Sequence, residues 1–267
     1  PDHRSSNGQT AAFFAVRPGC ALALERLLSA GTDLAAAVDN ISRTALFAAE
    51  DTESAQVLLD HRCDVHTRDR SGQTALFAAV QAEREAIARL LLNHGAEATV
   101  ADTDGRTALH FARGRQTQLL LEAKAEVDAC DSGQQTPLFF AAARGDGEAV
   151  HALAMAGADG SWKDHHGQTA LFYAAKQAPL DVVRLLVCEA LADPSVVDVQ
   201  RQTADKIARH SPSAAAGVAS YLAKAATRHR RSETQGALKK RRYCLAFDGV
   251  QYGTPPYEIA LVRLPRG

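Results

Sequence analysis

Histidines, cysteines and acidic residues are the first candidates for chemistry in this sequence, because they can ligate metals, transfer protons or act as nucleophiles. His165 and His166 are adjacent, which is a poor spacing for two ligands of one metal, and we expect both to be exposed turn residues. Asp102 and Asp104 suit a turn, where such acids bond nearby amides. The sequence has no C-x-x-C, H-E-x-x-H or G-x-S-x-G motif and no glycine-rich phosphate loop. We therefore predict no enzyme, no catalytic residue, no metal and no cofactor.

The five cysteines are odd in number and widely spaced, which predicts reduced thiols of an intracellular protein, most of them packed in or beside the core. They are Cys20, Cys63, Cys130, Cys188 and Cys244. No apolar run approaches the length of about 20 residues that a membrane span needs. Cytoplasm and nucleus are both open. Organelle import stays open too, because the sequence begins at Pro1 without a methionine.

Basic residues are concentrated near the carboxyl end. Residues 228–242 hold seven Lys or Arg and one Glu, a charge of +6, and residues 243–267 balance to zero, so residues 1–227 carry −7 of the total of −1. The cluster comprises Arg228, Arg230, Arg231, Lys239, Lys240, Arg241 and Arg242. RHRR and KKRR together resemble a two-part nuclear import signal with a short spacer. The alternatives are a linker that contacts nucleic-acid phosphates, a strap held by the acidic region, or a solvated charge run.

A phrase of the type GQTALFAAV recurs along the rest of the chain. Its threonines are Thr10, Thr44, Thr74, Thr107, Thr136, Thr169 and Thr203, at spacings of 34, 30, 33, 29, 33 and 34. A period near 33 with a Gly-x-Thr start is typical of a repeat made of a turn and two helices. The two short intervals, which follow Thr44 and Thr107, predict a shortened connection or helix in those repeats.

Each repeat has local signals for its turn and helices. An aspartate lies five residues before six of the threonines and can bond turn amides, and the threonine suits a helix N-cap whose hydroxyl accepts from a first-turn amide. An apolar helix follows, and then a second one with Leu, Ile or Val on one face, where we expect Leu90 and Leu185 to be buried. Such short helices bury their apolar faces by stacking on their neighbours.

The chain resembles the ankyrin repeat family over roughly residues 5–227. The resemblance lies in DTDGRTALHFA at 102–112, GQQTPLFFAAARGD at 133–146, LLLNHGAEA at 90–98 and LLSAGTDL at 27–34. It implies an all-α repeat solenoid of stacked helix-turn-helix units with turn or hairpin fingers, in repeats starting near 5, 39, 69, 102, 131, 164 and 198. Only His110 keeps the family histidine. Phenylalanine replaces it in five repeats and should pack in the core, at Phe13, Phe47, Phe77, Phe139 and Phe172.

The resemblance also implies that partners bind on the concave side, at the finger tips and the exposed side of the first helix. By register, the candidates for partner binding are Arg43, Arg70, Gln73, Gln81, Arg106, Arg113, Arg144, His165, His166, Gln168, Lys176 and Gln177. Arginine and lysine outnumber acids at these positions. This bias predicts a groove for an acidic or phosphorylated segment, because arginine pairs with carboxylate or phosphate through two bonds. The alternative is that exposed positions collect charge without a role.

The last residues break the repeat pattern. Asp248 and Gly249 between apolar residues favour a hairpin, so we expect a basic linker at 228–242 and a short β-rich, hairpin-like extension at 243–267. The leading functional hypothesis is a scaffold or adaptor that binds protein partners and belongs to a larger complex. A second is a structural subunit of a large assembly or ribonucleoprotein, whose basic linker contacts nucleic acid. A weaker third is the regulatory section of a longer enzyme.

Overall fold

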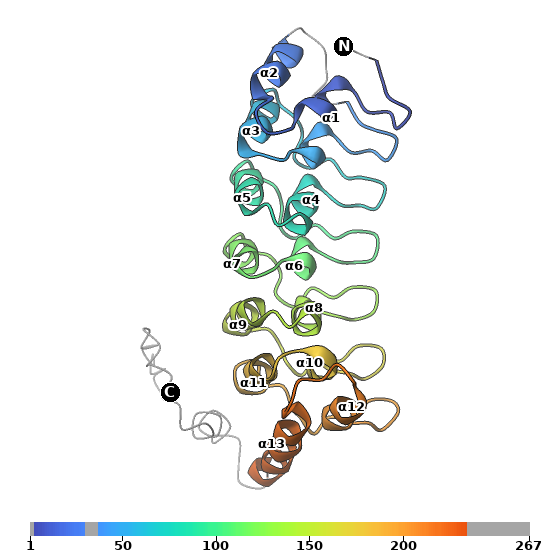
Figure 1. The fold of residues 1–267 in the computed structure, drawn as a ribbon, viewed down its shortest axis with the longest axis vertical. Helices are drawn as coiled ribbons and strands as arrows, with labels where there is room; N and C mark the ends of the chain where they lie inside the picture. The colour runs from blue at the N-terminus through green and yellow to red at the C-terminus, as the bar shows by residue number, and fades with distance from the viewer. Residues whose placement is uncertain (1–2, 30–36, 234–267) are drawn as a thin grey trace, which may run out of the picture.

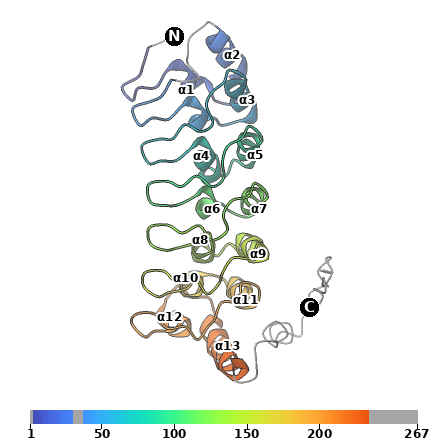
Figure 2. The ribbon, with the colours of Figure 1, turned by 180° about the vertical axis from the view of Figure 1, so that it is seen from behind.

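The computed structural model describes residues 3–29 and 37–233, and every named element within these ranges is a helix. The helices form one row of stacked repeats (Figure 1). From both sides, the finger turns, the first helices and the second helices stand in three neighbouring columns (Figures 1 and 2). The predicted α-helical repeat solenoid is confirmed for this part of the chain.

The first helices are α1 (Ala11–Ala15), the 3₁₀ helix η1 (Ala45–Ala48), α4 (Ala75–Gln81), α6 (Ala108–Phe111), α8 (Pro137–Arg144), α10 (Ala170–Gln177) and α12 (Ala204–His210). The second helices are α2 (Ala21–Ser29), α3 (Thr52–Asp60), α5 (Glu85–Asn93), α7 (Arg115–Glu122), α9 (Gly147–Met155), α11 (Leu180–Cys188) and α13 (Val218–Glu233). Residues 228–233 of the expected linker therefore continue helix α13. Residues 234–242 of that linker and the expected β-rich extension at 243–267 lie outside the described residues.

Six aspartates shape the fingers. In the fourth repeat, Asp102 Oδ1 accepts the amides of Asp104 at 3.0 Å and Arg106 at 2.9 Å, and its own amide donates to the Arg106 carbonyl at 2.8 Å. The same bonds from the amides two and four residues later occur at Asp39, Asp69, Asp131, Asp164 and Asp198. The residue two before each threonine has positive φ, which glycine supplies at Gly72 and Gly105. The predicted turn chemistry is confirmed.

Each finger is also bonded to the finger before it. The Thr103 amide donates to the Ser71 carbonyl at 2.9 Å, and the Ser132 amide donates to the Asp104 carbonyl at 2.7 Å. Equivalent bonds start from the amides of Asn40, Arg70, His165 and Val199. The finger column is thus a continuous hydrogen-bonded row, in which one finger fixes the position of the next.

The threonines occupy the N-cap position as predicted, but the expected hydroxyl cap is wrong in six of the seven described repeats. No side-chain capping bond forms at Thr10, Thr44, Thr74, Thr136, Thr169 or Thr203. The first-turn amide bonds to the threonine carbonyl instead, as from Phe77 to Thr74 at 3.0 Å. These threonines are packed against the core, where several hydroxyl oxygens are buried.

The core runs the length of the stack between the two helix columns. The five phenylalanines that replace the family histidine are only 1–8% exposed, so their predicted apolar packing is confirmed. Leu90 and Leu185 are half-buried rather than buried, and the fully buried residues are their neighbours Leu91 and Leu186. The expected register of the second helix was wrong by one residue.

The two short repeats lose their missing residues from the first helix and the following connection, as predicted. The first helices η1 and α6 have four residues each, whereas α4, α8 and α10 have seven or eight. Each stack neighbour of a short repeat therefore meets a first helix of a single turn.

His110 takes the place of phenylalanine in one of these short repeats. Its Nδ1 accepts the Thr107 amide at 3.0 Å, and its Nε2 lies 3.2 Å from the Gln135 carbonyl oxygen in the next repeat. This pattern requires a neutral ring with the proton on Nε2. Burial lowers the pKa of His110 below its ordinary value, despite the carbonyl of Gln135.

Stability should therefore fall with acid partly through His110. Because the folded pKa is lowered, the unfolded chain takes up the proton first as pH drops through about 6.5, with a slope of at most about 1.4 kcal/mol per pH unit. His110→Phe, the residue of five sister repeats, should remove this share of the loss. Urea unfolding between pH 7.5 and 5 measures it, and an unchanged slope in the variant would contradict the assignment.

Candidate functional site

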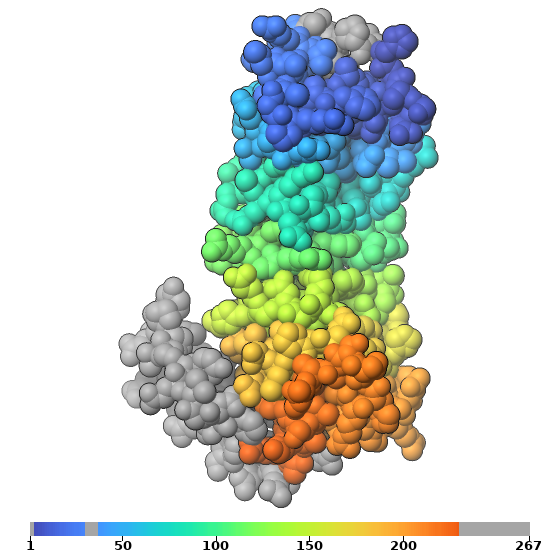
Figure 3. Space-filling view, viewed as in Figure 1, coloured from blue at the N-terminus to red at the C-terminus, as the bar shows by residue number. Residues whose placement is uncertain are grey.

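The twelve candidate residues all lie on the surface formed by the fingers and the first helices, which we call the inner surface. Those numbered 43, 70, 73, 106, 165, 166 and 168 are on fingers, and those numbered 81, 113, 144, 176 and 177 end or follow a first helix. The space-filling view shows the repeats as successive bands, so this surface crosses repeat boundaries (Figure 3). The structure brings the candidates onto one face but gives them unequal roles.

Two finger arginines are held by aspartates of their own repeat. Arg43 donates from Nε and Nη2 to Asp39 Oδ2 at 3.1 and 3.0 Å. Arg106 donates from Nε to Asp102 Oδ2 at 3.1 Å and pairs with Asp104 at 2.5 Å. Because Oδ1 of each finger aspartate already holds the turn, Oδ2 is the atom left to orient these guanidinium groups. Arg43 and Arg106 are thus partly structural.

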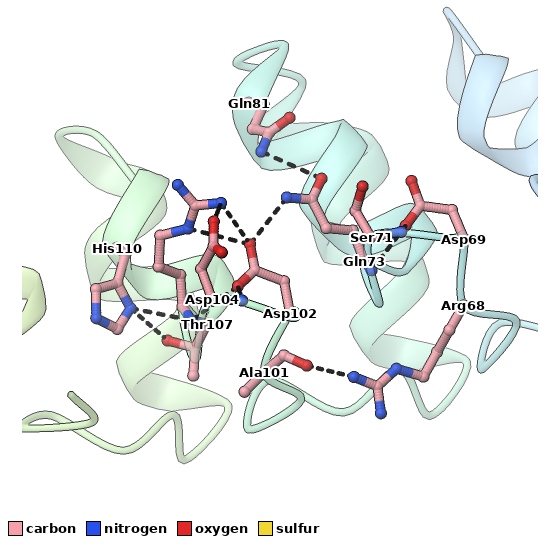
Figure 4. A network of polar contacts seen from close by, with 11 residues as sticks. Arg68, Asp69, Ser71, Gln73, Gln81, Ala101, Asp102, Asp104, Thr107 and His110 are labelled. Atoms are coloured by element: carbon pink, nitrogen blue, oxygen red, sulfur yellow. Dashed lines mark hydrogen bonds and ion pairs between the residues drawn. The ribbon is translucent and has the colours of Figure 1, made fainter. Parts of the chain in front are cut away.

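Glutamines at the same finger position bond to the next repeat instead. Gln73 donates to Asp102 Oδ2 at 3.1 Å (Figure 4), and Gln168 donates to Asp198 Oδ2 at 3.0 Å. Gln81 reaches Gln73 only weakly, at 3.5 Å. Burial would raise the pKa of Asp102, but the bonds from Gln73 and Arg106 outweigh burial and lower it. These glutamines therefore connect neighbouring repeats as well as lining the inner surface.

Arginines from the following repeats cover the backbone that the short repeats expose. Arg144 donates to the carbonyls of His110 at 3.0 Å and Ala112 at 2.7 Å, and Arg84 donates to the Ala49 carbonyl at 2.7 Å. These carbonyl acceptors lie at the carboxyl ends of the one-turn first helices η1 and α6. Burial lowers the pKa of Arg144. Arg144, predicted as a partner-binding residue, is thus first a structural contact, and sequence reasoning missed Arg84 entirely.

Three other candidates have exposed, positively charged side chains. Arg70 is exposed at a finger tip. Arg113 pairs with Glu83 at 3.0 Å, but both side chains are more than half exposed. Lys176 Nζ is exposed 4.8 Å from the Tyr173 ring centroid. Arg113 also lines an open hollow of about 340 Å³ with Arg144 and Asp146.

The remaining candidates are glutamine and histidine. Gln177 donates to the Ala143 carbonyl at 2.6 Å, which again crosses a repeat boundary. His165 and His166 are exposed on one finger, and His165 Nε2 lies 3.0 Å from the Ser132 carbonyl oxygen. Among the described residues, no group of three or more histidines, cysteines or acids is placed to hold a metal. The exposed position expected for the two histidines is confirmed.

The four described cysteines differ in burial. Cys63 is buried, and burial raises the pKa of its thiol. Cys20 and Cys188 are half-buried beside the core, and Cys130 is exposed next to a finger, so three of the four described cysteines lie in or beside the core as expected. Cys244 lies outside the described residues. No helix in the described ranges combines the length and apolar character required to cross a bilayer.

Sequence reasoning also missed three aromatic residues on the inner surface. Phe111, Phe140 and Tyr173 lie four residues after the threonine in three consecutive repeats, and all are half-buried. The signal was available, because HF, FF and FY stand at one register in these repeats. It was overlooked because aromatic residues in an apolar helix suggest core packing.

Comparisons with known proteins agree with this architecture. A family model described as ankyrin repeats (3 copies) matches residues 47–129 and 113–198. The solved ankyrin repeat domain of Bcl-3, described as a unique member of the IkappaB protein family, is 30% identical with a TM-score of 0.60, covering 69% of this chain and 85% of that one. The human ASB11 ankyrin repeat domain is 24% identical with a TM-score of 0.70, covering 80% and 97%.

The structural role of Arg144 can be separated from binding. Arg144→Met should lower the free energy of unfolding by about 1–3 kcal/mol, because two carbonyls lose a charged donor. The matched change Arg113→Met, at an exposed ion pair, should cost less than about 1 kcal/mol. Urea unfolding of both variants provides the comparison. Equal losses of unfolding free energy in the two variants would show that the bonds from Arg144 to the His110 and Ala112 carbonyls do not stabilise the short repeat.

Proposed function

Because this chain belongs to the ankyrin repeat family, whose repeats are protein–protein interaction modules, we propose that it is an adaptor or scaffold that binds a segment of a partner protein along its inner surface. The proposal does not require catalysis by the repeats. The partner segment lies across several fingers and first helices, as a solenoid surface allows.

The partner segment is acidic, carrying carboxylates or phosphates. The observation that carries this proposal is the set of exposed cations on the inner surface, Arg70, Arg113 and Lys176. They stand apart from Arg43, which the finger binds. The finger aspartates stay charged, but their Oδ1 atoms accept turn amides and several Oδ2 atoms accept side-chain donors, so few of their oxygens are open to pair with these cations. Residues 1–227 carry a net charge of −7, so the chain as a whole does not attract acids. An acidic segment would be attracted locally, where these cations lie.

Charge reversal tests this function while sparing the structural arginines. Peptides are first selected from a displayed random library on the unmodified chain. The variant Arg70→Glu, Arg113→Glu and Lys176→Glu should then weaken their binding about tenfold or more, because charge-assisted bonds are lost. Dissociation constants from fluorescence anisotropy measure the effect, and circular dichroism checks that the helices remain.

The control reverses three exposed arginines on second helices, Arg26, Arg89 and Arg115, so that both variants change charge equally. The control should bind the selected peptides within about twofold of the unmodified chain. If both variants bind equally well, or if selection yields no acidic peptides, the proposed acidic partner is wrong.

A further inference from the structure

Three half-buried aromatic rings form a strip on the inner surface. They are Phe111 on α6, Phe140 on α8 and Tyr173 on α10, and we call them the aromatic strip. In the two repeats before them, the same position holds Ala48 and Ala78. The strip therefore occupies three consecutive repeats, the fourth to the sixth of seven, and the aromatic Phe14 at this position in the first repeat is separated from it by two alanines.

Each ring of the strip rests on a ring of the preceding repeat. Phe111 lies 6.1 Å from Phe77 between centroids. Phe140 meets His110 edge-on at 5.3 Å, and Tyr173 meets Phe139 edge-on at 5.6 Å. Rings held in this way lose little conformational freedom when a partner binds, which favours tight contacts.

Contacts with the fingers place the strip in the corner between the fingers and the first helices. The guanidinium carbon of Arg106 lies 5.2 Å from the Phe111 ring centroid. The Tyr173 hydroxyl donates to Asp164 Oδ2 at 2.8 Å and accepts from Gln135 at 2.6 Å. A segment lying along the inner surface would therefore pass over these rings.

Cations surround the strip. Arg106 lies over Phe111, Lys176 lies over Tyr173, and Arg113 and Arg144 line the hollow between the ends of α6 and α8. Both carboxylate oxygens of the nearby Asp146 are occupied by backbone amides. Its Oδ2 accepts the Gly114 amide at 2.9 Å, and its Oδ1 accepts the Ala149 amide at 3.0 Å. The strip thus combines fixed apolar surface with a positive rim.

We propose that the aromatic strip is the anchoring site for an acidic protein segment that carries an apolar or aromatic side chain between its carboxylates. The proposal rests on the proposed function and names the chemistry of its partner. The apolar side chain packs at Phe140, between the cation-covered rings of Phe111 and Tyr173, and the carboxylates pair with Arg113, Lys176 and their neighbours. Buried aromatic contacts ringed by polar groups are typical of binding hot spots.

A nucleic acid fits this site less well, although rings and cations can also bind bases and phosphates. Cations already lie over Phe111 and Tyr173, so successive bases cannot stack along the strip, whereas one apolar side chain can pack at Phe140 between them. The charge of −7 on residues 1–227 also opposes a polyanion. A short acidic peptide carries fewer negative charges than a nucleic acid and therefore meets less of this repulsion.

The experiment uses Phe140→Ala and a matched control, Phe14→Ala. Phe14 holds the same position on α1, outside the strip, and is 51% exposed. The probes are a fluorescent peptide of alternating glutamates with central phenylalanines, the same peptide with serine replacing phenylalanine, and an oligothymidine. Phe140→Ala should raise the dissociation constant of the phenylalanine peptide about tenfold or more. Phe14→Ala should change that constant less than about twofold.

The serine peptide should bind all three proteins weakly and alike, because it has no anchor. If circular dichroism shows that Phe140→Ala is unfolded, Phe140→Leu replaces it. This variant should still bind the phenylalanine peptide at least about threefold more weakly than the unmodified chain does. Lack of binding by the phenylalanine peptide to the unmodified chain overturns the proposal. So does tighter binding of oligothymidine that is sensitive to Phe140.

The outcomes also separate this proposal from the proposed function. If reversal of Arg70, Arg113 and Lys176 abolishes peptide binding while Phe140→Ala does not, the acidic inner-surface site stands and the aromatic anchor is wrong. If neither change matters, both proposals fail.

Discussion

The carboxylate at the base of six of the seven described fingers is the constraint on which the rest of the structure depends. One oxygen of Asp102 accepts two amides of its own turn, and five other aspartates repeat this bond. The bond closes the finger, and the closed finger presents its backbone for bonding to the next finger. The second oxygen is then left in a fixed direction, where it orients Arg106 and receives Gln73 from the preceding repeat. A single residue type thus sets the turn, the stacking of the fingers and the polar lining of the inner surface.

The same constraint divides the polar residues of the inner surface into two groups. Arg43, Arg106 and Gln168 donate hydrogen bonds to finger aspartates. Arg144 donates to the carbonyls that a short repeat leaves without a partner. Arg113 remains more than half exposed beside them. Exposure alone therefore does not separate the residues that the fold uses from those that it leaves open. The residues proposed for partner contact are those with the fewest bonds inside the fold.

The sequence was sufficient for the repeat architecture, because period, turn aspartates and apolar helices all point to the same unit. The shortened helices and the buried phenylalanines also followed from it. It could not show that Arg144 reaches back to a carbonyl of the preceding repeat, because such a bond depends on the gap left by a neighbour's missing residues. Leu91 rather than Leu90 faces the core because rotation of the second helix is set by stacking, which spacing alone leaves uncertain by one residue. The aromatic strip was visible in the letters, but only the structure shows that finger residues contact it.

Amide hydrogen exchange on Asp102→Ala tests most directly whether the carboxylate holds both its finger and the next one. Loss of the carboxylate should speed exchange at the Asp104 and Arg106 amides, since both lose their acceptor. It should also speed exchange at the Ser132 amide, which bonds to the Asp104 carbonyl of the loosened finger. Amides of distant fingers, such as Val199, should keep their rates. Unchanged exchange at Asp104, Arg106 and Ser132 in a variant that remains helical would contradict the central role given to the aspartates.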